Sequence, residues 1–261
     1  MKKPLIIILV CLLAFLYVGL YYYNHWKPLW SLEKPRTIYS VEHLQDDTVR
    51  ILMIGDSWVG LRTDSLNHLL HVRLSAKTGR PVIVRTKGKG GEKSRGIYQL
   101  LFESNGYGTK SLLLSGADYC IVIAGINDAA ANLGKKQYIH HIKLIIDFLL
   151  ANNIRPVLIE IPDVNIWKIY GEKPIKDMMV DFIKSKMTRC GMYQYSEYRQ
   201  ALQLLSKEYN DSVLYVSMKG WNGDGSDLNK CLFLDDQIHL NQQGYIKMDS
   251  CVIDAIIRDL K

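Results

Sequence analysis

The sequence has few cysteines and no sign of a metal site or a nucleic-acid-binding module. Its five cysteines among 261 residues form no CxxC pair and no spacing typical of zinc ligands; they are Cys11, Cys120, Cys190, Cys231 and Cys251. Basic residues outnumber acidic ones by 33 to 26, a net charge of +7, but they are scattered along the chain. We therefore expect no metal, no cofactor and no nucleic-acid partner.

Charged residues are absent from one long stretch near the N-terminus. Between Leu5 and Tyr23 the chain carries none, and a run of about 20 apolar residues can cross a bilayer as a helix. Trp26 follows a run of three tyrosines, an arrangement typical of the aromatic belt at a membrane interface. The small-x-small cleavage site of a signal peptide is missing. We therefore predict an uncleaved signal anchor, a transmembrane segment over residues 1–26.

The residues that flank this stretch indicate its orientation. Lys2 and Lys3 favour an amino end in the cytoplasm, which places the rest of the chain outside, in a periplasmic or extracellular position. The chain would be secreted if the segment were cleaved. Residues 27–48 are predicted to be a polar juxtamembrane connector, and residues 49–261 a folded domain.

From residue 49 onward, apolar runs alternate with amphipathic segments. Strands are expected at 49–54, 81–86, 118–124, 156–161 and 213–216, and helices at 64–77, 95–103, 135–152, 175–186, 197–209 and after Asn241. Continuous apolar strands separated by helices are typical of a parallel sheet covered on both faces. The predicted fold class is α/β, a three-layer α/β/α sandwich with a mainly parallel sheet of about five strands.

Polar residues that could carry chemistry come directly after these strands. The first strand runs into Gly-Asp-Ser, which ends at Ser57, and the second into the glycine-rich stretch KGKGGEKS, residues 87–94. The third leads into GIND with Asn127, and the last loop contains Asp236 and His239. Because carboxyl ends of parallel strands share one edge of a sheet, these groups are expected to meet there. Acyl transfer needs a nucleophile, a base, a group that orients the base and donors for an oxyanion, and these loops supply all of them.

The order of these blocks resembles the SGNH hydrolases, also called the GDSL family of esterases and lipases. The resemblance covers residues 49–258 and implies a flavodoxin-like fold, with Ser57 as nucleophile, His239 as general base and Asp236 as its orienting carboxylate. It also implies an oxyanion hole made of the Ser57 and Gly91 backbone amides and the Asn127 side chain.

Several assignments stay open at this point. Gly90 is one residue away from Gly91 and could supply the oxyanion amide instead, and Asp235 could replace Asp236. Trp58 stands where the family name has leucine, and it could line the substrate pocket or pack under the turn. Asp56 is expected to fix the turn by hydrogen bonding to local amides.

The resemblance implies a serine esterase acting on an ester of an acylated glycan or lipid in the cell envelope or outside the cell. The acyl group is expected to be acetyl or another short chain. Two alternatives remain: an acyltransferase that passes the acyl group to a glycan through the same acyl-enzyme, and a non-catalytic glycan-binding domain. Membrane contact is expected through the N-terminal helix.

Overall fold

The computed structural model describes residues 2–162, 164, 173–218, 221 and 231–261. The chain divides into two compact units, Met1–Glu33 and Lys34–Lys261. The first unit contains the helix α1 (Lys2–Trp30), whose segment Lys3–Lys27 is long and apolar enough to cross a membrane. The second unit contains every strand found among the described residues.

The second unit is built on a five-stranded parallel sheet, as the alternating pattern predicted. The strands are β1 (Val49–Gly55), β2 (Val82–Gly88), β3 (Tyr119–Ile123), β4 (Arg155–Ile159) and β5 (Leu214–Val216), in the order β2-β1-β3-β4-β5. The neighbouring strands of this sheet all pair in parallel, and Gly55 at the end of β1 is aligned with Gly88 on β2 and Ile123 on β3. The loops after β1, β2 and β3 therefore leave the sheet at one edge.

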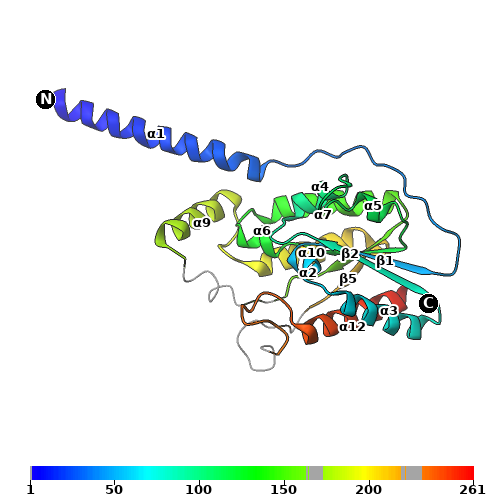
Figure 1. Ribbon diagram of the computed structural model, residues 1–261. Helices are drawn as coiled ribbons and strands as arrows, with labels where there is room; N and C mark the ends of the chain where they lie inside the picture. The colour runs from blue at the N-terminus through cyan, green and yellow to red at the C-terminus, as the bar shows by residue number, and fades with distance from the viewer. Residues whose placement is uncertain (1, 163, 165–172, 219–220, 222–230) are drawn as a thin grey trace. The chain divides into compact units, whose positions relative to one another are not determined.

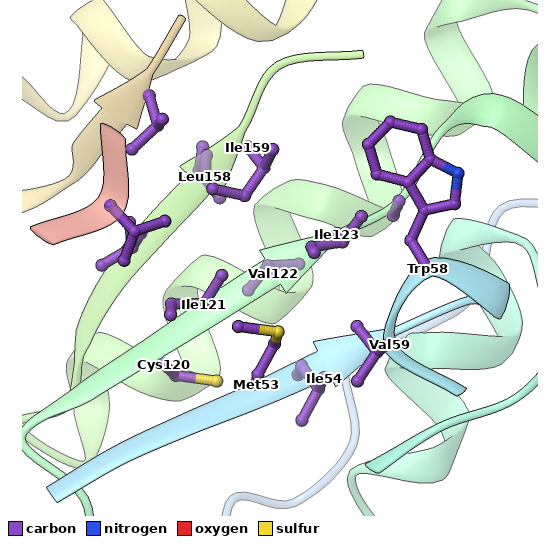
Figure 2. Packing of buried hydrophobic residues seen from close by; sticks show 14 of the residues in the cluster. Met53, Ile54, Trp58, Val59, Cys120, Ile121, Val122, Ile123, Leu158 and Ile159 are labelled. Carbon is purple, nitrogen blue, oxygen red and sulfur yellow. The ribbon is translucent and has the colours of Figure 1, made fainter. Parts of the chain in front are cut away.

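Helices cover both faces of the sheet (Figure 1). On one side α3 (Asp64–Thr78) packs against β2 and against α12 (Gln242–Asp259). On the other side α4 (Ser94–Leu100) and α10 (Tyr195–Glu208) both pack against α7 (Lys135–Ala151), and these helices contact β1, β5 and β4 respectively. Every residue of β1 and β3 is buried, and all of them except Arg50 are apolar, as expected for strands covered on both faces. Figure 2 shows Met53, Val122 and Leu158 from adjacent strands in one packed cluster.

The remaining elements are short or lie at the periphery. They are α2 (Ser57–Gly60), α5 (Lys110–Leu113), α6 (Ile126–Ala130), α9 (Ile175–Thr188) and the 3-10 helix η1 (Asn210–Ser212). The helices α2, α5 and α6 were not predicted, because four or five residues are too few to show helical periodicity. The strand expected at residues 156–161 begins one residue earlier and ends at Ile159.

Part of the predicted connector packs onto the sheet-containing unit. The Tyr39 hydroxyl donates to the Leu101 carbonyl at 2.6 Å, and its ring lies against Phe102 and Phe148. The Val41 amide donates to the Asn152 side chain at 2.8 Å. These residues adopt no regular structure, so no periodicity in the sequence indicates that they pack.

Candidate active site

Ser57 is positioned by a tight turn at the carboxyl end of β1. It is the first residue of α2, and the Asp56 side chain caps that helix by accepting from the Trp58 amide at 3.0 Å. A Cβ at Gly55 would lie 2.3 Å from the Ile123 carbonyl oxygen of β3, so only glycine fits there. The Gly-Asp-Ser triplet thus serves close strand packing, helix capping and display of the hydroxyl.

The loop before α12 brings His239 to this hydroxyl. His239 Nε2 lies 2.9 Å from Ser57 Oγ, across 182 residues of sequence. On the opposite side of the ring, His239 Nδ1 lies 2.6 Å from Asp236 Oδ2. The other oxygen of Asp236 accepts from the amides of Ile238 and His239, both at 2.9 Å. The structure therefore brings together the three residues predicted to form a triad, in a continuous chain of contacts.

The surroundings of Asp236 favour its ionised form. Partial burial acts to raise the pKa of this carboxyl, but hydrogen bonds from the His239 ring and from the amides of His239 and Ile238 outweigh it, and the pKa is lowered. Within the described parts of the chain, the neighbouring Asp235 makes no hydrogen bond to the His239 ring. Of the two carboxylates left open by the sequence, Asp236 is the one in position.

The loop after β2 and the start of α6 lie beside the turn that carries Ser57. The Lys89 amide donates to the Gly55 carbonyl at 3.0 Å, which fixes the glycine-rich loop to β1. Asn127 Nδ2 donates to the Glu92 carbonyl at 2.9 Å and also approaches Asp56 Oδ2 at 3.3 Å. The predicted oxyanion donors are thus drawn from loops that are bonded to one another.

Either of two glycines in that loop, Gly90 or Gly91, could supply the backbone amide of the oxyanion hole. In the part of the chain that the structure describes, the backbone amides of Ser57, Gly90 and Gly91 have no hydrogen-bond partner, so each is available as a donor. Gly91 adopts a φ of +72°, a conformation that favours glycine, whereas Gly90 does not. The contacts alone leave the choice between the two amides open.

Comparison with known proteins decides the family. A family model described as the GDSL-like lipase/acylhydrolase family matches residues 53–246, which include all four loops described above. The chain belongs to the GDSL-like lipase/acylhydrolase family. The resemblance seen in the sequence is thereby confirmed, and the acylhydrolase is a serine ester hydrolase by family. No curated protein sequence matches the chain.

Several solved structures share the fold of this acylhydrolase. The lipase/acylhydrolase from Enterococcus faecalis is 17% identical with a TM-score of 0.61, and the match covers 80% of this chain and 96% of that one. The psychrotrophic esterase EstA from Pseudoalteromonas sp. is 18% identical with a TM-score of 0.55, covering 82% and 99%. An acetyl xylan esterase, AlAXEase, is 15% identical with a TM-score of 0.55, covering 80% and 100%. These likenesses confirm the predicted α/β fold.

Trp58 of the acylhydrolase packs beneath the turn. Its side chain is fully buried, and its indole N–H donates to the Ile238 carbonyl at 3.2 Å, one residue before His239. Its own carbonyl accepts from the Tyr245 hydroxyl of α12 at 2.8 Å. Of the two roles that the sequence left open for Trp58, this burial favours packing under the turn, because no part of the side chain is accessible. Trp58 instead connects the loop that carries Ser57 to the loop that carries His239.

Two buried carboxyls of the acylhydrolase, Asp56 and Asp128, hold the loops of the site in place. Asp128 accepts from the backbone amide of Ser94 at 2.9 Å and from its hydroxyl at 2.6 Å, and so joins the third loop to the second. Burial raises the pKa of Asp128, and it raises the pKa of Asp56 to about 7, with a further contribution from the charge of Asp128. The role expected for Asp56, bonding to a local amide, is confirmed. The position of Asp128 directly after Asn127 was the only sequence signal for its role.

The residues that the structure describes contain no group of three or more His, Cys, Asp or Glu side chains that could hold a metal ion. The chemistry that the described arrangement can perform is acid–base and nucleophilic. A histidine between a hydroxyl and an ionised carboxylate can take a proton from the hydroxyl and remain oriented while it does so.

Proposed function

We propose that this acylhydrolase removes a short acyl group, such as acetyl, from a glycan or lipid of the cell envelope or the extracellular space. Ser57 is the nucleophile, His239 the general base and Asp236 the residue that orients His239. One observation carries the proposal: the continuous chain from Asp236 Oδ2 through His239 to Ser57 Oγ, with distances of 2.6 and 2.9 Å.

The proposed reaction has two halves. His239 Nε2 takes the proton of Ser57 as Oγ attacks the ester carbonyl carbon, and the negative charge moves to the carbonyl oxygen. The backbone amides of Ser57 and Gly91 and the side-chain amide of Asn127 would donate to that oxygen. His239 then protonates the departing alcohol, which leaves the acyl group on Ser57. In the second half His239 activates a water molecule, and the acyl group leaves as a carboxylic acid.

The openness of the site supports a small acyl group on a bulky alcohol. The Asp236 side chain is 44% exposed and that of His239 is 26% exposed, so the triad lies at the surface and not at the base of a tunnel. An open site admits a polymer or a membrane lipid as the alcohol portion. A long acyl chain, in contrast, is held best by an enclosed apolar pocket.

The N-terminal helix supports a location at the outer face of a membrane. Its segment Lys3–Lys27 has the length and composition of a span, and Lys2 and Lys3 favour a cytoplasmic amino end. We propose a single-pass anchor with the hydrolase unit on the extracytoplasmic side, where envelope glycans and lipids are the available esters.

A panel of esters tests this function. The full chain in detergent micelles is given p-nitrophenyl esters of rising acyl length and acetylated sugars, with Ser57→Ala as the matched inactive variant. We expect kcat/KM to be highest for acetyl or propionyl esters and to fall with longer chains. A maximum at octanoyl or longer esters would contradict the short-chain assignment. Product analysis with a glycan acceptor present separates hydrolysis from transfer.

A further inference from the structure

Helix α9 (Ile175–Thr188) is amphipathic, but its apolar side faces solvent. Five large apolar side chains recur at i, i+4, i+7, i+8 and i+12, a spacing that places them on one side of a helix. Their exposed fractions range from 44% to 78%; they are Ile175, Met179, Phe182, Ile183 and Met187. Figure 1 shows α9 at the periphery of the unit that contains the sheet. We call these five residues the α9 apolar face.

The opposite side of α9 is polar and packs onto the protein. Asp181 is buried, and its carboxylate bonds to Lys173 Nζ at 2.7 Å and to the Tyr193 hydroxyl. Ser185, four residues further along the same side, is also buried. Among the residues that the structure describes, the apolar side of this helix stays exposed, and an exposed apolar patch of this kind marks an interaction surface.

Basic side chains accompany the α9 apolar face. Lys176, Lys186 and Arg189 are exposed on α9 or at its end, whereas Asp177 is the one exposed acidic residue within the helix as the structure describes it. Lys186 Nζ lies 5.0 Å from the centre of the Phe182 ring, so positive charge stands directly beside the apolar surface. This combination is complementary to the boundary between anionic headgroups and acyl chains of a bilayer.

The shortness of the segment that follows α1 also favours a bilayer as the partner of this face. The helix α1 ends at Trp30, and the Arg36 amide is already bonded to the Tyr98 hydroxyl of α4 at 2.8 Å. The five residues 31–35 between these points span at most about 20 Å when fully extended. If α1 is embedded in a membrane, that membrane is always within reach of the hydrolase unit.

We propose that the α9 apolar face inserts into the headgroup region of an anionic bilayer and forms a second attachment of the hydrolase beside α1. The inference goes beyond the proposed esterase function and does not depend on it, but it does rest on insertion of α1. A helix lying in the interface would restrict rotation of the hydrolase unit about its short tether and hold its site in one orientation to the surface.

Lipid photolabelling tests the attachment directly. The full chain is reconstituted into phosphatidylcholine vesicles, with or without phosphatidylglycerol, that contain a phospholipid with a diazirine near the headgroup. After irradiation and digestion, labelling of the α9 peptide is compared with that of α1 by mass spectrometry. We expect α9 to be labelled, and Phe182→Gln with Ile183→Gln to reduce this roughly tenfold while α1 labelling stays unchanged.

Two further variants separate the contributions. Lys176→Glu with Lys186→Glu should lower α9 labelling roughly threefold or more in vesicles with phosphatidylglycerol and little in those without it. Leu204→Gln, at a residue of α10 that is 56% exposed, is the matched control and should change nothing. All variants should hydrolyse p-nitrophenyl acetate like the parent chain, which shows that the fold is retained.

Other outcomes would overturn the proposal. Labelled α1 with unlabelled α9 would mean that the face does not touch lipid. Covalent cross-links between the α9 helices of two copies, with no lipid label, would make a second copy the occupant. Absence of label on α1 as well would remove the membrane tether on which the inference rests, while leaving the esterase function untouched.

Discussion

The two ring nitrogens of His239 have different partners, and these partners determine whether the histidine can act as a base. Its Nδ1 faces Asp236 Oδ2 at 2.6 Å, which keeps a hydrogen on Nδ1 and leaves Nε2 free to accept the proton of Ser57 at 2.9 Å. The same carboxylate also accepts hydrogen bonds from two backbone amides of the loop. Orientation of the ring and shape of the loop therefore depend on one side chain.

Asp236→Asn should separate these two roles. The amide oxygen can still accept from the backbone of the loop, but a side-chain N–H aimed at Nδ1 favours the wrong tautomer of His239. We expect kcat for p-nitrophenyl acetate to fall about 10²- to 10⁴-fold with little change in KM or in thermal stability. Asp235→Asn is the matched control one residue away. An equal loss of kcat in both variants would contradict the assignment of Asp236.

Asp56 should make stability depend on pH. Its pKa in the folded chain is about 7, above the ordinary value of 3.8, because burial disfavours the charged form. The folded chain thus binds the proton more tightly than the unfolded chain. The stabilisation is complete below about pH 4 and is lost as the pH rises to about 7.

Urea unfolding of the parent chain and of Asp56→Asn checks this pH dependence. Asparagine can keep the cap on the Trp58 amide but does not titrate. The unfolding free energy of the parent chain should fall between about pH 4 and about pH 7, and that of the variant should fall less. The unfolding free energy of the variant should still depend on pH to some extent, because the pKa values of the buried carboxyls of Asp128 and Asp249 are also raised. An identical fall in both proteins would show that Asp56 does not titrate in this range.

At the scale of elements, a buried ion pair joins the turn after α2 to the last helix. Arg62 contacts both carboxylate oxygens of Asp249 on α12, at 2.9 and 2.7 Å, and both side chains are fully buried. Arg62 also bonds to the Asn67 side chain and lies over the Tyr245 ring. The pair therefore connects the segment just after the turn that carries Ser57 to the helix that follows His239.

Arg62→Met should be strongly destabilising, because it leaves the Asp249 carboxylate buried without a partner. We expect the unfolding free energy to fall by about 3–5 kcal/mol in urea denaturation. Arg62→Met combined with Asp249→Leu removes both charges and should recover most of this loss. If the double variant were no more stable than the single one, the loss would come from packing and not from the unpaired charge.

The sequence predicted the elements that repeat a pattern and missed those that depend on distant contacts. Buried strands such as β1 and β3 were placed to within one or two residues because they are short apolar runs. The helix α7 was placed equally well because its apolar residues recur at helical spacing. The blocks around Ser57, Asn127 and His239 were found because each follows a strand or precedes a helix. Arg62 and Asp249 are 187 residues apart in the sequence, and no local pattern predicts that they pair. The burial of Trp58 could not be read either, since it depends on the loop that carries Ile238.

At the scale of the whole molecule, an apolar N-terminal helix is joined by a few residues to a hydrolase unit with an open site. If α1 is an uncleaved anchor, the chain should remain in the membrane pellet after extraction with alkaline carbonate and require detergent for release. Immunoblotting of the pellet and supernatant measures this. A soluble product that starts after the apolar segment, identified by N-terminal sequencing, would instead indicate a cleaved signal peptide and a secreted enzyme.

The most direct test of the central claim is labelling of the full chain with a fluorophosphonate, followed by mapping of the modified residue by mass spectrometry. The account predicts covalent label on Ser57, its loss in Ser57→Ala, and strongly reduced labelling in His239→Ala, because the hydroxyl then lacks its base. Ester hydrolysis should disappear in parallel. Label on another residue, or full hydrolysis of p-nitrophenyl acetate by Ser57→Ala, would contradict the account.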